Sequence, residues 1–340
     1  MIRKKSYSIY DVAKKAGVSI ATVSRVLNNS NLVKTKTKEQ VLKAIEELDY
    51  TPNFFARNLV RKASKTIGIL IPDIINPVFS EMSKGISDRA FLRKYTVFLC
   101  NTDSSVKKEV EFVKNLLNKH VEGIIFISTE MSKYKGDFKH YLYLYNKNIP
   151  IIFINGLIEN IDIPFIRIDE VKAGYIATKH MLKIGLKRIA FLGGPLNFIP
   201  TYEKLQGYKK AFEEFDISIN EELIVLDSFD MESGYKNTIK LLEIENRPEG
   251  IITASDLFAI EAIKAAFTKG INVPNDLKII GFDDISLSSI YNPSITTVAQ
   301  PKYEMGTMAL DILVKIIEKK DLQNKKILVE PKLILRDSCP

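Results

Sequence analysis

From Thr66 onward, the chain alternates between short apolar runs and longer segments with helical periodicity. Apolar runs without polar alternation are typical of strands buried on both faces, as in parallel sheets covered by helices. The alternation therefore predicts an α/β fold. Seven strands exceed one comfortable sheet, so we expect two parallel-sheet α/β subdomains. The expected strands are Thr66–Ile71, Tyr95–Cys100, Gly123–Ser128, Pro150–Asn155, Arg188–Gly193, Gly250–Ala254 and Leu277–Phe282. The expected helices include Phe79–Leu92, Lys107–Lys119, Lys172–Ile184 and Leu257–Gly270.

Residues 6–48 follow a different pattern, that of short helices, and the polar stretch Lys62–Lys65 looks like a linker. Hydrophobic residues are 46% of the 340 residues, which is ample material for globular cores. No apolar run is long enough to span a membrane, and no apolar h-region follows the basic start, so we expect neither a membrane span nor a secretory signal. The two cysteines, Cys100 and Cys339, lie far apart and fit a reducing cytoplasm.

The positive charge of the chain is concentrated at its beginning. Residues 1–62 hold 13 Lys and Arg against 5 Asp and Glu, whereas the remaining residues hold 36 of each kind. This asymmetry indicates a nucleic-acid-binding head on a neutral body. On charge alone, a solvated basic face is the alternative.

The segment from Asp11 to Asn28 has the spacing of a helix-turn-helix. A close crossing of two helices needs a small residue, which Ala13 supplies, and Gly17 tolerates the positive φ of the turn. Val23 and Val26 give the second helix an apolar face, and Ser19 suits its N-cap. A third helix, capped by Thr35 or Thr37, would carry the apolar stripe Val41, Leu42, Ile45 and Leu48.

Several side chains of the second helix are left off its buried face. Arg25 has the fork that pairs with guanine, and Ile20 or Ala21 can contact a thymine methyl. Short polar side chains suit phosphate oxygens. A small three-helix domain without a DNA role is the alternative. The DNA-binding residues predicted here are Ser19, Ile20, Ala21, Thr22, Ser24, Arg25 and Asn28.

The chain resembles the lactose-repressor/galactose-repressor family of bacterial transcription regulators along essentially its whole length. The motifs that carry the resemblance are Ile9–Ala13, Ala21–Asn28, Ile45–Leu48, Tyr50–Asn53, Ala56–Leu59, Ile71–Pro77, Val121–Ile125, Arg188–Gly194, Ile280–Asp284, Thr296–Pro301 and Leu335–Ser338. The resemblance implies a homodimer that binds pseudo-palindromic operator DNA. It also implies a body like that of periplasmic sugar-binding proteins, with a small-molecule effector in the cleft. Because the chain stops at Pro340, we expect no tetramerising heptads.

The resemblance divides the chain into a helix-turn-helix domain (1–52), a hinge helix and linker (53–65) and an effector-binding and dimerisation domain (66–340). Subdomain 1 is expected at about 66–164 and 294–324, and subdomain 2 at about 165–293 and 325–340. The hinge would fold on operator DNA, with Leu59 wedged into the minor groove. Phe54 and Phe55 stand where smaller residues are common. The hinge residues expected to contact DNA are Asn53, Ala56, Arg57 and Leu59.

Ligands of open α/β sheets bind at the carboxyl ends of the strands. An aromatic floor such as Phe79 or Phe229 would take the apolar face of a sugar, while amides and a carboxylate take its hydroxyls. For any one residue, an ordinary loop or core position is the alternative. The effector-binding residues expected here are Asn76, Phe79, Ser128, Asn155, Lys204, Phe229, Ser255, Asp283 and Gln300.

Three of these positions depart from the family pattern: Lys204 replaces the usual Arg, Ser255 the usual Asn, and Asn155 a frequent Asp. A lysine offers a point charge instead of a bidentate fork, which would suit a sugar phosphate better than a free sugar. The catabolite control proteins of the family, which respond to a phosphorylated carrier protein, tolerate such changes as well. Both kinds of signal stay open.

Catalytic signatures are missing from the sequence, including GxSxG, the P-loop, HExxH, CxxC and GxGxxG. His120, His140 and His180 lack metal-binding spacing, so we expect neither an enzyme nor a metal or cofactor. The predicted function is a transcriptional regulator, a repressor of carbohydrate-utilisation genes in the main hypothesis. A soluble sugar-binding protein or sugar enzyme is the alternative, under which deletion of residues 1–62 would leave a functional ligand binder.

Overall fold

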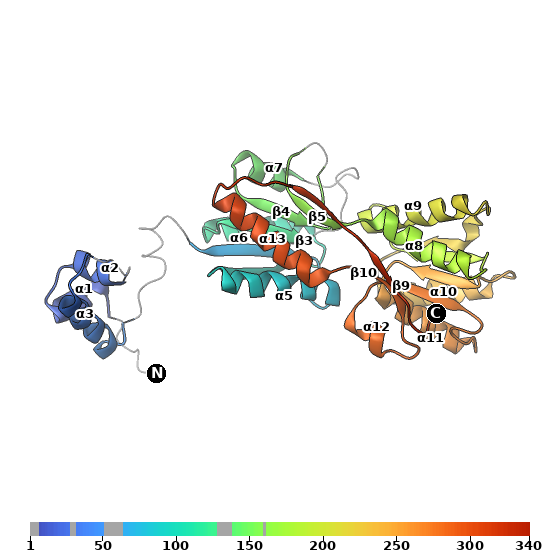
Figure 1. The fold of residues 1–340 in the computed structure, drawn as a ribbon, viewed down its shortest axis with the longest axis horizontal. Coiled ribbons are helices and arrows are strands. Elements are labelled where there is room, and N and C mark those ends of the chain that lie inside the picture. The colour runs from blue at the N-terminus through green and yellow to red at the C-terminus, as the bar shows by residue number, and fades with distance from the viewer. Residues whose placement is uncertain (1–6, 28–31, 51–63, 128–137, 159–160) are drawn as a thin grey trace. The chain divides into compact units, whose positions relative to one another are not determined.

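The structure is a computed structural model that describes residues 7–27, 32–50, 64–127, 138–158 and 161–340. The chain forms two compact units, Met1–Ser64 and Lys65–Pro340. Among the described residues, Figure 1 shows helices alone in the first unit, and helices with two sheets in the second. The expectation of a helical head followed by two α/β subdomains is confirmed.

The helices of the first unit begin and end where local chemistry favours it. The Ser8 backbone N–H donates to Asp11 Oδ2 at 2.8 Å, which caps the first helix. Gly17 ends that helix with φ +64°, a conformation that glycine adopts without strain. The predicted turn is therefore confirmed. The helices are α1 (Ile9–Ala16), α2 (Ile20–Leu27) and α3 (Thr35–Glu47).

A small core joins these helices, and it differs in detail from the predicted one. Leu42 is 48% exposed, because a helix turns by about 100° per residue and Val41 and Ala44 already define the buried side of α3. The predicted cap of α3 is also wrong, since the helix already includes Thr35 and its N-cap is Lys34. The buried core residues are Val12, Ala13, Val23, Val26, Val41 and Ala44.

The first sheet of the second unit is parallel throughout. Its strand order is β11-β5-β4-β3-β1-β2. All residues of β1, β3 and β4 are buried, as expected for a sheet covered on both faces. The strands are β1 (Thr66–Ile71), β2 (Thr96–Asn101), β3 (Gly123–Ile127), β4 (Ile151–Ile154), β5 (Phe165–Ile168) and β11 (Lys326–Val329).

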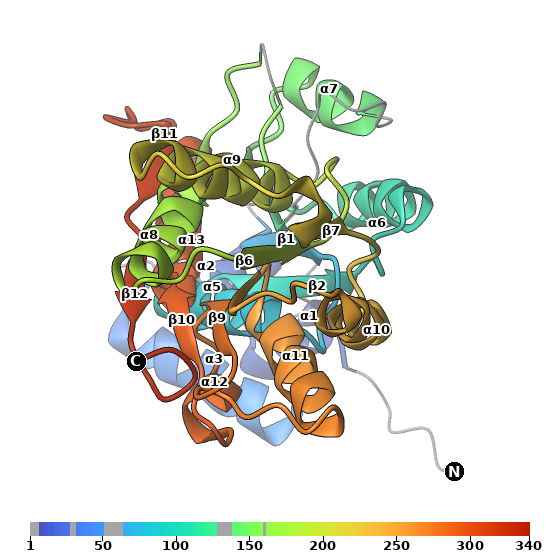
Figure 2. The same cartoon turned by 90° about the vertical axis from the view of Figure 1, so that its right-hand side faces the viewer.

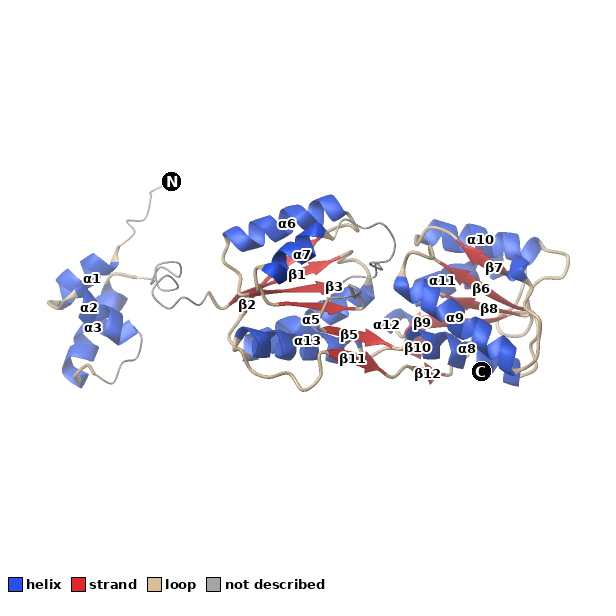
Figure 3. Ribbon diagram, turned by 90° about the horizontal axis from the view of Figure 1, so that it is seen from above, coloured by secondary structure: helices blue, strands red, loops and turns tan. Residues whose placement is uncertain are grey.

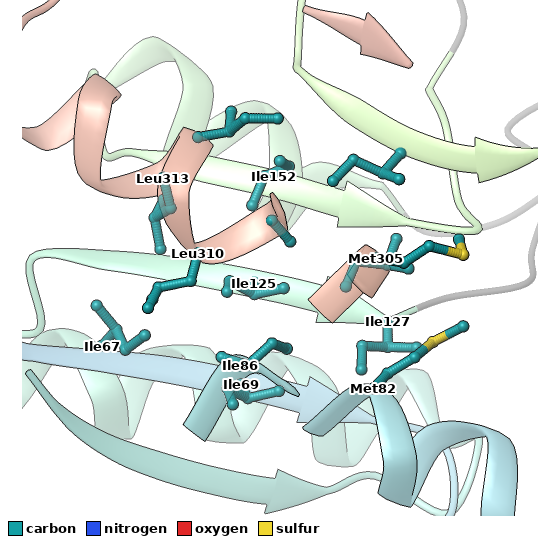
Figure 4. Packing of buried hydrophobic residues seen from close by; sticks show 14 of the residues in the cluster. Ile67, Ile69, Met82, Ile86, Ile125, Ile127, Ile152, Met305, Leu310 and Leu313 are labelled. Carbon is teal, nitrogen blue, oxygen red and sulfur yellow. The ribbon is translucent and has the colours of Figure 1, made fainter. Parts of the chain in front are cut away.

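Helices α5 and α13 cover one face of the first sheet, and α6 and α7 cover the other (Figure 3). On the α5 and α13 side, aliphatic side chains of the strands interdigitate with Met82, Met305 and Leu310 (Figure 4). A Cβ atom at Gly306 would lie 2.2 Å from the Met82 carbonyl oxygen, so glycine is required where α5 and α13 cross. The helices are α5 (Pro77–Leu92), α6 (Val106–Asn118), α7 (Lys139–Asn146) and α13 (Lys302–Ile317).

The second sheet has the order β12-β10-β9-β8-β6-β7. It is parallel except for the edge strand β12, which runs antiparallel to β10. The strands are β6 (Ile189–Gly193), β7 (Ile224–Leu226), β8 (Gly250–Thr253), β9 (Lys278–Asp283), β10 (Thr296–Ala299) and β12 (Lys332–Ile334).

Helices α8 and α9 cover one face of the second sheet, and α10 and α11 cover the other (Figure 2). The α8 and α9 pair crosses closely, because a Cβ atom at Gly174 would lie 2.1 Å from the Lys204 carbonyl oxygen. The remaining helices are α8 (Glu170–Lys183), α9 (Ile199–Glu214), α10 (Met231–Glu243), α11 (Asp256–Thr268), the short α12 (Ser286–Ile290) and the 3-10 turn η1 (Glu221–Leu223).

Within the described part of the second unit, the chain crosses between the sheets after β5, after β10 and after β11. Each crossing comes a few residues later than the expected subdomain boundaries, because these strands complete their pairing before the chain leaves the sheet. β5 and β11 therefore belong to the first sheet, and β10 belongs to the second. Hereafter, "first subdomain" and "second subdomain" mean each sheet with its covering helices.

No helix in the described residues is long and apolar enough to cross a membrane.

Candidate functional site

Helix α2 is the second helix of the predicted pair, and Ser19 caps it. The Thr22 backbone N–H donates to Ser19 Oγ at 3.2 Å, so the predicted cap is confirmed. Val23 and Val26 are buried in the core that α2 shares with α1 and α3. The opposite face of α2 is left open to solvent.

On this open face, Ile20, Ala21 and Arg25 are exposed, and Thr22 and Ser24 are half-buried. An exposed aliphatic side chain at the start of the helix is suited to a thymine methyl, and the Arg25 guanidinium to a guanine edge. The exposed face of α2 thus carries three of the side chains predicted to contact DNA, Ile20, Ala21 and Arg25.

The remaining predicted DNA contacts cannot be placed in the fold. Asn28 and the hinge residues Asn53, Ala56, Arg57 and Leu59 lie outside the described residues.

In the body, Asp283 ends strand β9 next to a crossing between the sheets. Gln300, which follows β10, donates from Nε2 to Asp283 Oδ1 at 2.7 Å. Burial raises the pKa of the Asp283 carboxyl, and the nearby Lys204 ammonium opposes that rise. The structure therefore brings three of the predicted effector residues together.

Lys204 has a partner that the sequence analysis did not find. Its Nζ atom lies 3.1 Å from Glu170 Oε2, and both side chains are almost fully buried. The ammonium also lies 4.7 Å from the centre of the Phe282 ring. Burial raises the pKa of Glu170, while Lys204 lowers it. The positive charge at this position is thus already balanced by a carboxylate of the protein.

Phe229 forms an aromatic wall at the carboxyl end of the second sheet. Its ring stacks on Phe258, with centroids 5.0 Å apart, and more distantly on Phe198 at 6.4 Å. Phe229 is still 44% exposed, and its ring lies where a Cβ atom of Gly194 would be. Ser255 serves α11 as N-cap, accepting from the Phe258 N–H at 3.3 Å.

Two of the predicted residues carry buried oxygens that lack a hydrogen-bond partner in the described structure: Asn155 Oδ1 and Gln300 Oε1. Asn155 follows β4, and its φ of +61° is rare for a residue with a side chain. A buried acceptor without a partner is costly, so both atoms mark positions where a ligand could donate a hydrogen bond.

The other predicted effector residues are tied less closely to this cluster. Asn76 caps α5 by accepting from the Val78 N–H at 3.0 Å, and Phe79 packs against the first core. Among the described residues, no hydrogen bond joins Asn76, Phe79 or Asn155 to Asp283 or its partners. Ser128 lies outside the described residues.

Further charged groups, absent from the sequence prediction, surround the cluster. Arg167 of β5 is buried and pairs with Glu203 of α9 at 2.5 Å, linking the two subdomains. Asp256 is fully buried, which raises its pKa to about 7, and the Asp283 carboxylate contributes to the rise. Its partners are the Ile285 N–H and the hydroxyls of Ser288 and Thr297. Arg167 lies in the strand Phe165–Ile168, and Glu170 follows this strand. Strand-end reasoning missed both residues because the sequence analysis did not predict that short strand.

The protein has a three-helix head with an exposed recognition helix. Its two-sheet body carries a polar cluster where the chain crosses between the sheets. These features define a class of protein, a DNA-binding regulator with a ligand-binding body. Comparison with known proteins agrees. Residues 8–53 match the family model described as bacterial regulatory proteins, lacI family, and residues 178–339 match the periplasmic binding protein-like domain.

Full-length relatives are similar over nearly the whole chain. It is 38% identical over 333 residues to the HTH-type transcriptional regulator RegA of Clostridium saccharobutylicum, covering 97% of this chain and 98% of the relative. It is 37% identical over 332 residues to Catabolite control protein A of Priestia megaterium, with the same coverage. The chain belongs to the lacI family of bacterial regulatory proteins and is a DNA-binding transcriptional regulator.

A solved structure agrees with this assignment. The lac repressor dimer bound to operator and the anti-inducer ONPF superposes with a TM-score of 0.88 at 27% identity, covering 98% of this chain and 99% of that one.

Proposed function

We propose that the protein is a repressor that binds pseudo-palindromic operator DNA as a homodimer. Its affinity for the operator falls or rises when a sugar-like effector binds between its subdomains. The observation that carries the proposal is the open face of α2, where Arg25 and Ile20 are exposed beside a buried valine stripe. Repressors of this architecture read base edges with such a face in the major groove. Two-fold symmetric DNA then follows from a two-fold symmetric dimer.

Direct base reading would fall to Arg25, with Ile20 and Ala21 reading thymine methyls. Thr22 and Ser24 would contact phosphates, since short hydroxyl side chains suit that position. The hinge residues Asn53, Ala56, Arg57 and Leu59 are proposed to add contacts in the minor groove.

For the effector, the balance of charges favours an uncharged ligand. Lys204 is paired with Glu170, and Asp283 adds a second carboxylate to the cluster. A phosphate would meet two buried carboxylates and no free cation among these three groups, which is unfavourable at low effective dielectric. The sequence alone favours a sugar phosphate because Lys204 offers a positive charge. The pairing of Lys204 with Glu170 removes that reason.

Hydrogen-bond chemistry supports a ligand rich in donors. Asp283, Asn155 Oδ1 and Gln300 Oε1 are all acceptors, and the two amide oxygens have no partner among the described residues. Hydroxyl groups would donate to them, and the exposed Phe229 ring would cover an apolar face of the ligand. A free polyhydroxylated compound, such as a sugar, fits both requirements. Asn76, Phe79, Ser128 and Ser255 are proposed to complete the site.

The DNA-binding part of the proposal is tested by Arg25→Ala. It should lose about 1–3 kcal/mol on a duplex selected from a random library and relax preference at one base pair per half-site. Lys43→Ala is the control. Lys43 is exposed on α3, so this substitution also removes one positive charge, but from a helix other than α2. If Arg25→Ala weakens selected and unrelated duplexes by the same factor, Arg25 contacts phosphate and the assignment of base reading is wrong.

The effector part is tested by thermal-shift measurements on the full chain with free hexoses and pentoses and with their phosphate esters. A free sugar should raise the unfolding midpoint, and its phosphate ester should not. A shift by the ester alone would refute the argument from charge. If no sugar acts and a phosphorylated carrier protein raises operator affinity, the corepressor alternative is correct.

A further inference from the structure

Strand β9 ends in a backbone elbow formed by two successive residues in the left-handed region. Asp283 has φ +105° and Asp284 has φ +53°. Non-glycine residues pay a conformational cost there, and such a conformation persists only where surrounding contacts hold it. The elbow includes Asp283, the proposed effector carboxylate.

Part of the hold on the elbow comes from the second subdomain, to which it belongs. Arg336 donates to Asp284 Oδ1 at 2.6 Å, and the Thr297 hydroxyl accepts from the Asp284 N–H at 3.3 Å. The next amide, that of Ile285, donates to the buried Asp256 carboxyl at 2.9 Å. These contacts stabilise the elbow, and all of them come from the second subdomain.

A second hold comes from the first subdomain, through Lys302 at the start of α13. The Lys302 side chain is almost fully buried, and its Nζ atom donates to the carbonyl oxygens of Asp283 (2.6 Å) and Asp284 (3.0 Å). Glu81 of α5 lies 3.5 Å from the same atom. The adjacent Ile285 is buried in the core that contains α5, α13 and the first sheet. Contacts from the first subdomain thus also hold the elbow in place.

The ammonium group of Lys302 has three protons, and two of them are used in hydrogen bonds to the elbow. Both donate to the elbow carbonyls, and Glu81 Oε2 lies 3.5 Å from the same nitrogen. The contacts of Lys302 thus go to the elbow backbone and to Glu81. Lys302 therefore acts through Asp283 and is a positioning residue.

We propose that Lys302 is the latch that couples the effector-binding carboxylate of Asp283 to the relative position of the two subdomains. A ligand that pulls Asp283 must move the elbow carbonyls, and these pull on α13 through Lys302. The inference rests on the proposed function for its ligand and its operator, but the latch itself is a property of the unliganded chain. Because buried hydrogen bonds to a charged group are strong, losing the latch should release the subdomains.

The test compares three matched variants of the full chain. Lys302→Met keeps the length of the side chain and removes the latch. Arg336→Met removes an equivalent positive charge from the same elbow within its own subdomain. Lys315→Met removes a charge from the exposed side of α13. Lys302→Gln replaces Lys302→Met if circular dichroism shows that the latter does not fold.

The first readout is the distance between spin labels on exposed cysteines introduced by Glu111→Cys on α6 and Lys236→Cys on α10. The native Cys100 and Cys339 are buried and stay unlabelled. We expect Lys302→Met to increase, by roughly tenfold or more, the population of molecules with a second distance between the two labels. The other two variants should match the wild type. The latch is overturned if Lys302→Met leaves the distribution unchanged, or if Arg336→Met changes it as much.

The second readout is affinity for the duplex selected from a random library, which a purely structural role of Lys302 would leave unchanged. We expect Lys302→Met to alter this affinity by about fivefold or more and to leave affinity for unrelated duplexes unchanged. Unchanged affinity for the selected duplex would overturn the coupling. If the wild type selects no duplex, the proposed function fails, and the label distances still decide whether the latch exists.

Discussion

Lys204→Met should destabilise the second unit strongly, because it removes the cation from a buried ion pair. The Lys204 side chain is 5% exposed, and its Nζ lies 3.1 Å from Glu170 Oε2. Methionine fills most of the same volume. The substitution therefore isolates the charge from the packing.

The expected cost follows from the geometry of the pair. At a separation of 3.1 Å and an effective dielectric constant of about 20, the attraction is on the order of 5 kcal/mol, which is an upper bound. Removing one partner of such a pair typically costs about 3–5 kcal/mol, since the other charge stays buried. Glu170 can escape part of this cost by binding a proton, because burial already raises its pKa. We expect a loss of about 3 kcal/mol at pH 8 and a smaller loss at pH 5.

The assay is urea unfolding of the full chain followed by circular dichroism. Lys210→Met, an exposed change on the same helix, should cost less than about 0.5 kcal/mol. The double variant Lys204→Met with Glu170→Leu should come within about 1–2 kcal/mol of the wild type, because no unpaired charge remains in the pair. The reasoning fails if Lys204→Met behaves like Lys210→Met, or if the double variant costs the sum of the two single changes.

Two further predictions concern pH and salt. Burial raises the pKa of Asp256 to about 7 from an ordinary 3.8, so its contribution to stability is complete below about pH 4 and lost as pH rises through 7. The free energy of unfolding of the wild type minus that of Asp256→Asn should therefore fall across this range, by up to about 1.4 kcal/mol per pH unit; a flat difference would contradict the buried titration. Operator affinity should fall by roughly 10³–10⁵ between 50 and 200 mM salt if the dimer neutralises about 6–10 phosphates. A nearly flat salt titration would show that the basic head is not the DNA-binding element.

The long apolar strands could be predicted because their pattern is strong. β1 coincides with the predicted Thr66–Ile71, and each of the other six predicted runs overlaps a strand whose ends differ from the predicted ends by at most one residue. β5 escaped because it has four residues, one of them Arg167. β11 and β12 escaped because they are short and contain only exposed and half-buried residues, so their identity as strands depends on neighbours distant in sequence.

The helix pair was predictable in more detail than the body. Its turn and cap depend on Gly17 and Ser19, which act within a few residues of themselves. Leu42 shows the limit, since an apolar residue at the edge of a stripe does not reveal whether it is covered.

Partners in the body cluster come from distant elements and could not be read locally. Lys204 was predicted from the sequence as an effector-binding residue, but its partner Glu170 lies on another helix and already balances its charge. The Lys302 contacts to the elbow join α13 to the end of β9 and depend on the crossing between sheets. Strand-end reasoning places a residue at a sheet edge, and only the fold decides what faces it.

The measurement that bears most directly on the account is operator affinity with and without the sugar identified by thermal shift, for the wild type and for Asp283→Ala. The Asp283 carboxylate is proposed to accept two charge-assisted hydrogen bonds from adjacent hydroxyls of the sugar. For the wild type, the sugar should change operator affinity by about 5–150-fold, and operator should change sugar affinity by the same factor. Asp283→Ala should bind operator within a few-fold of the wild type and ignore the sugar. An Asp283→Ala variant that still responds fully would contradict the account, because the signal would then enter the protein elsewhere.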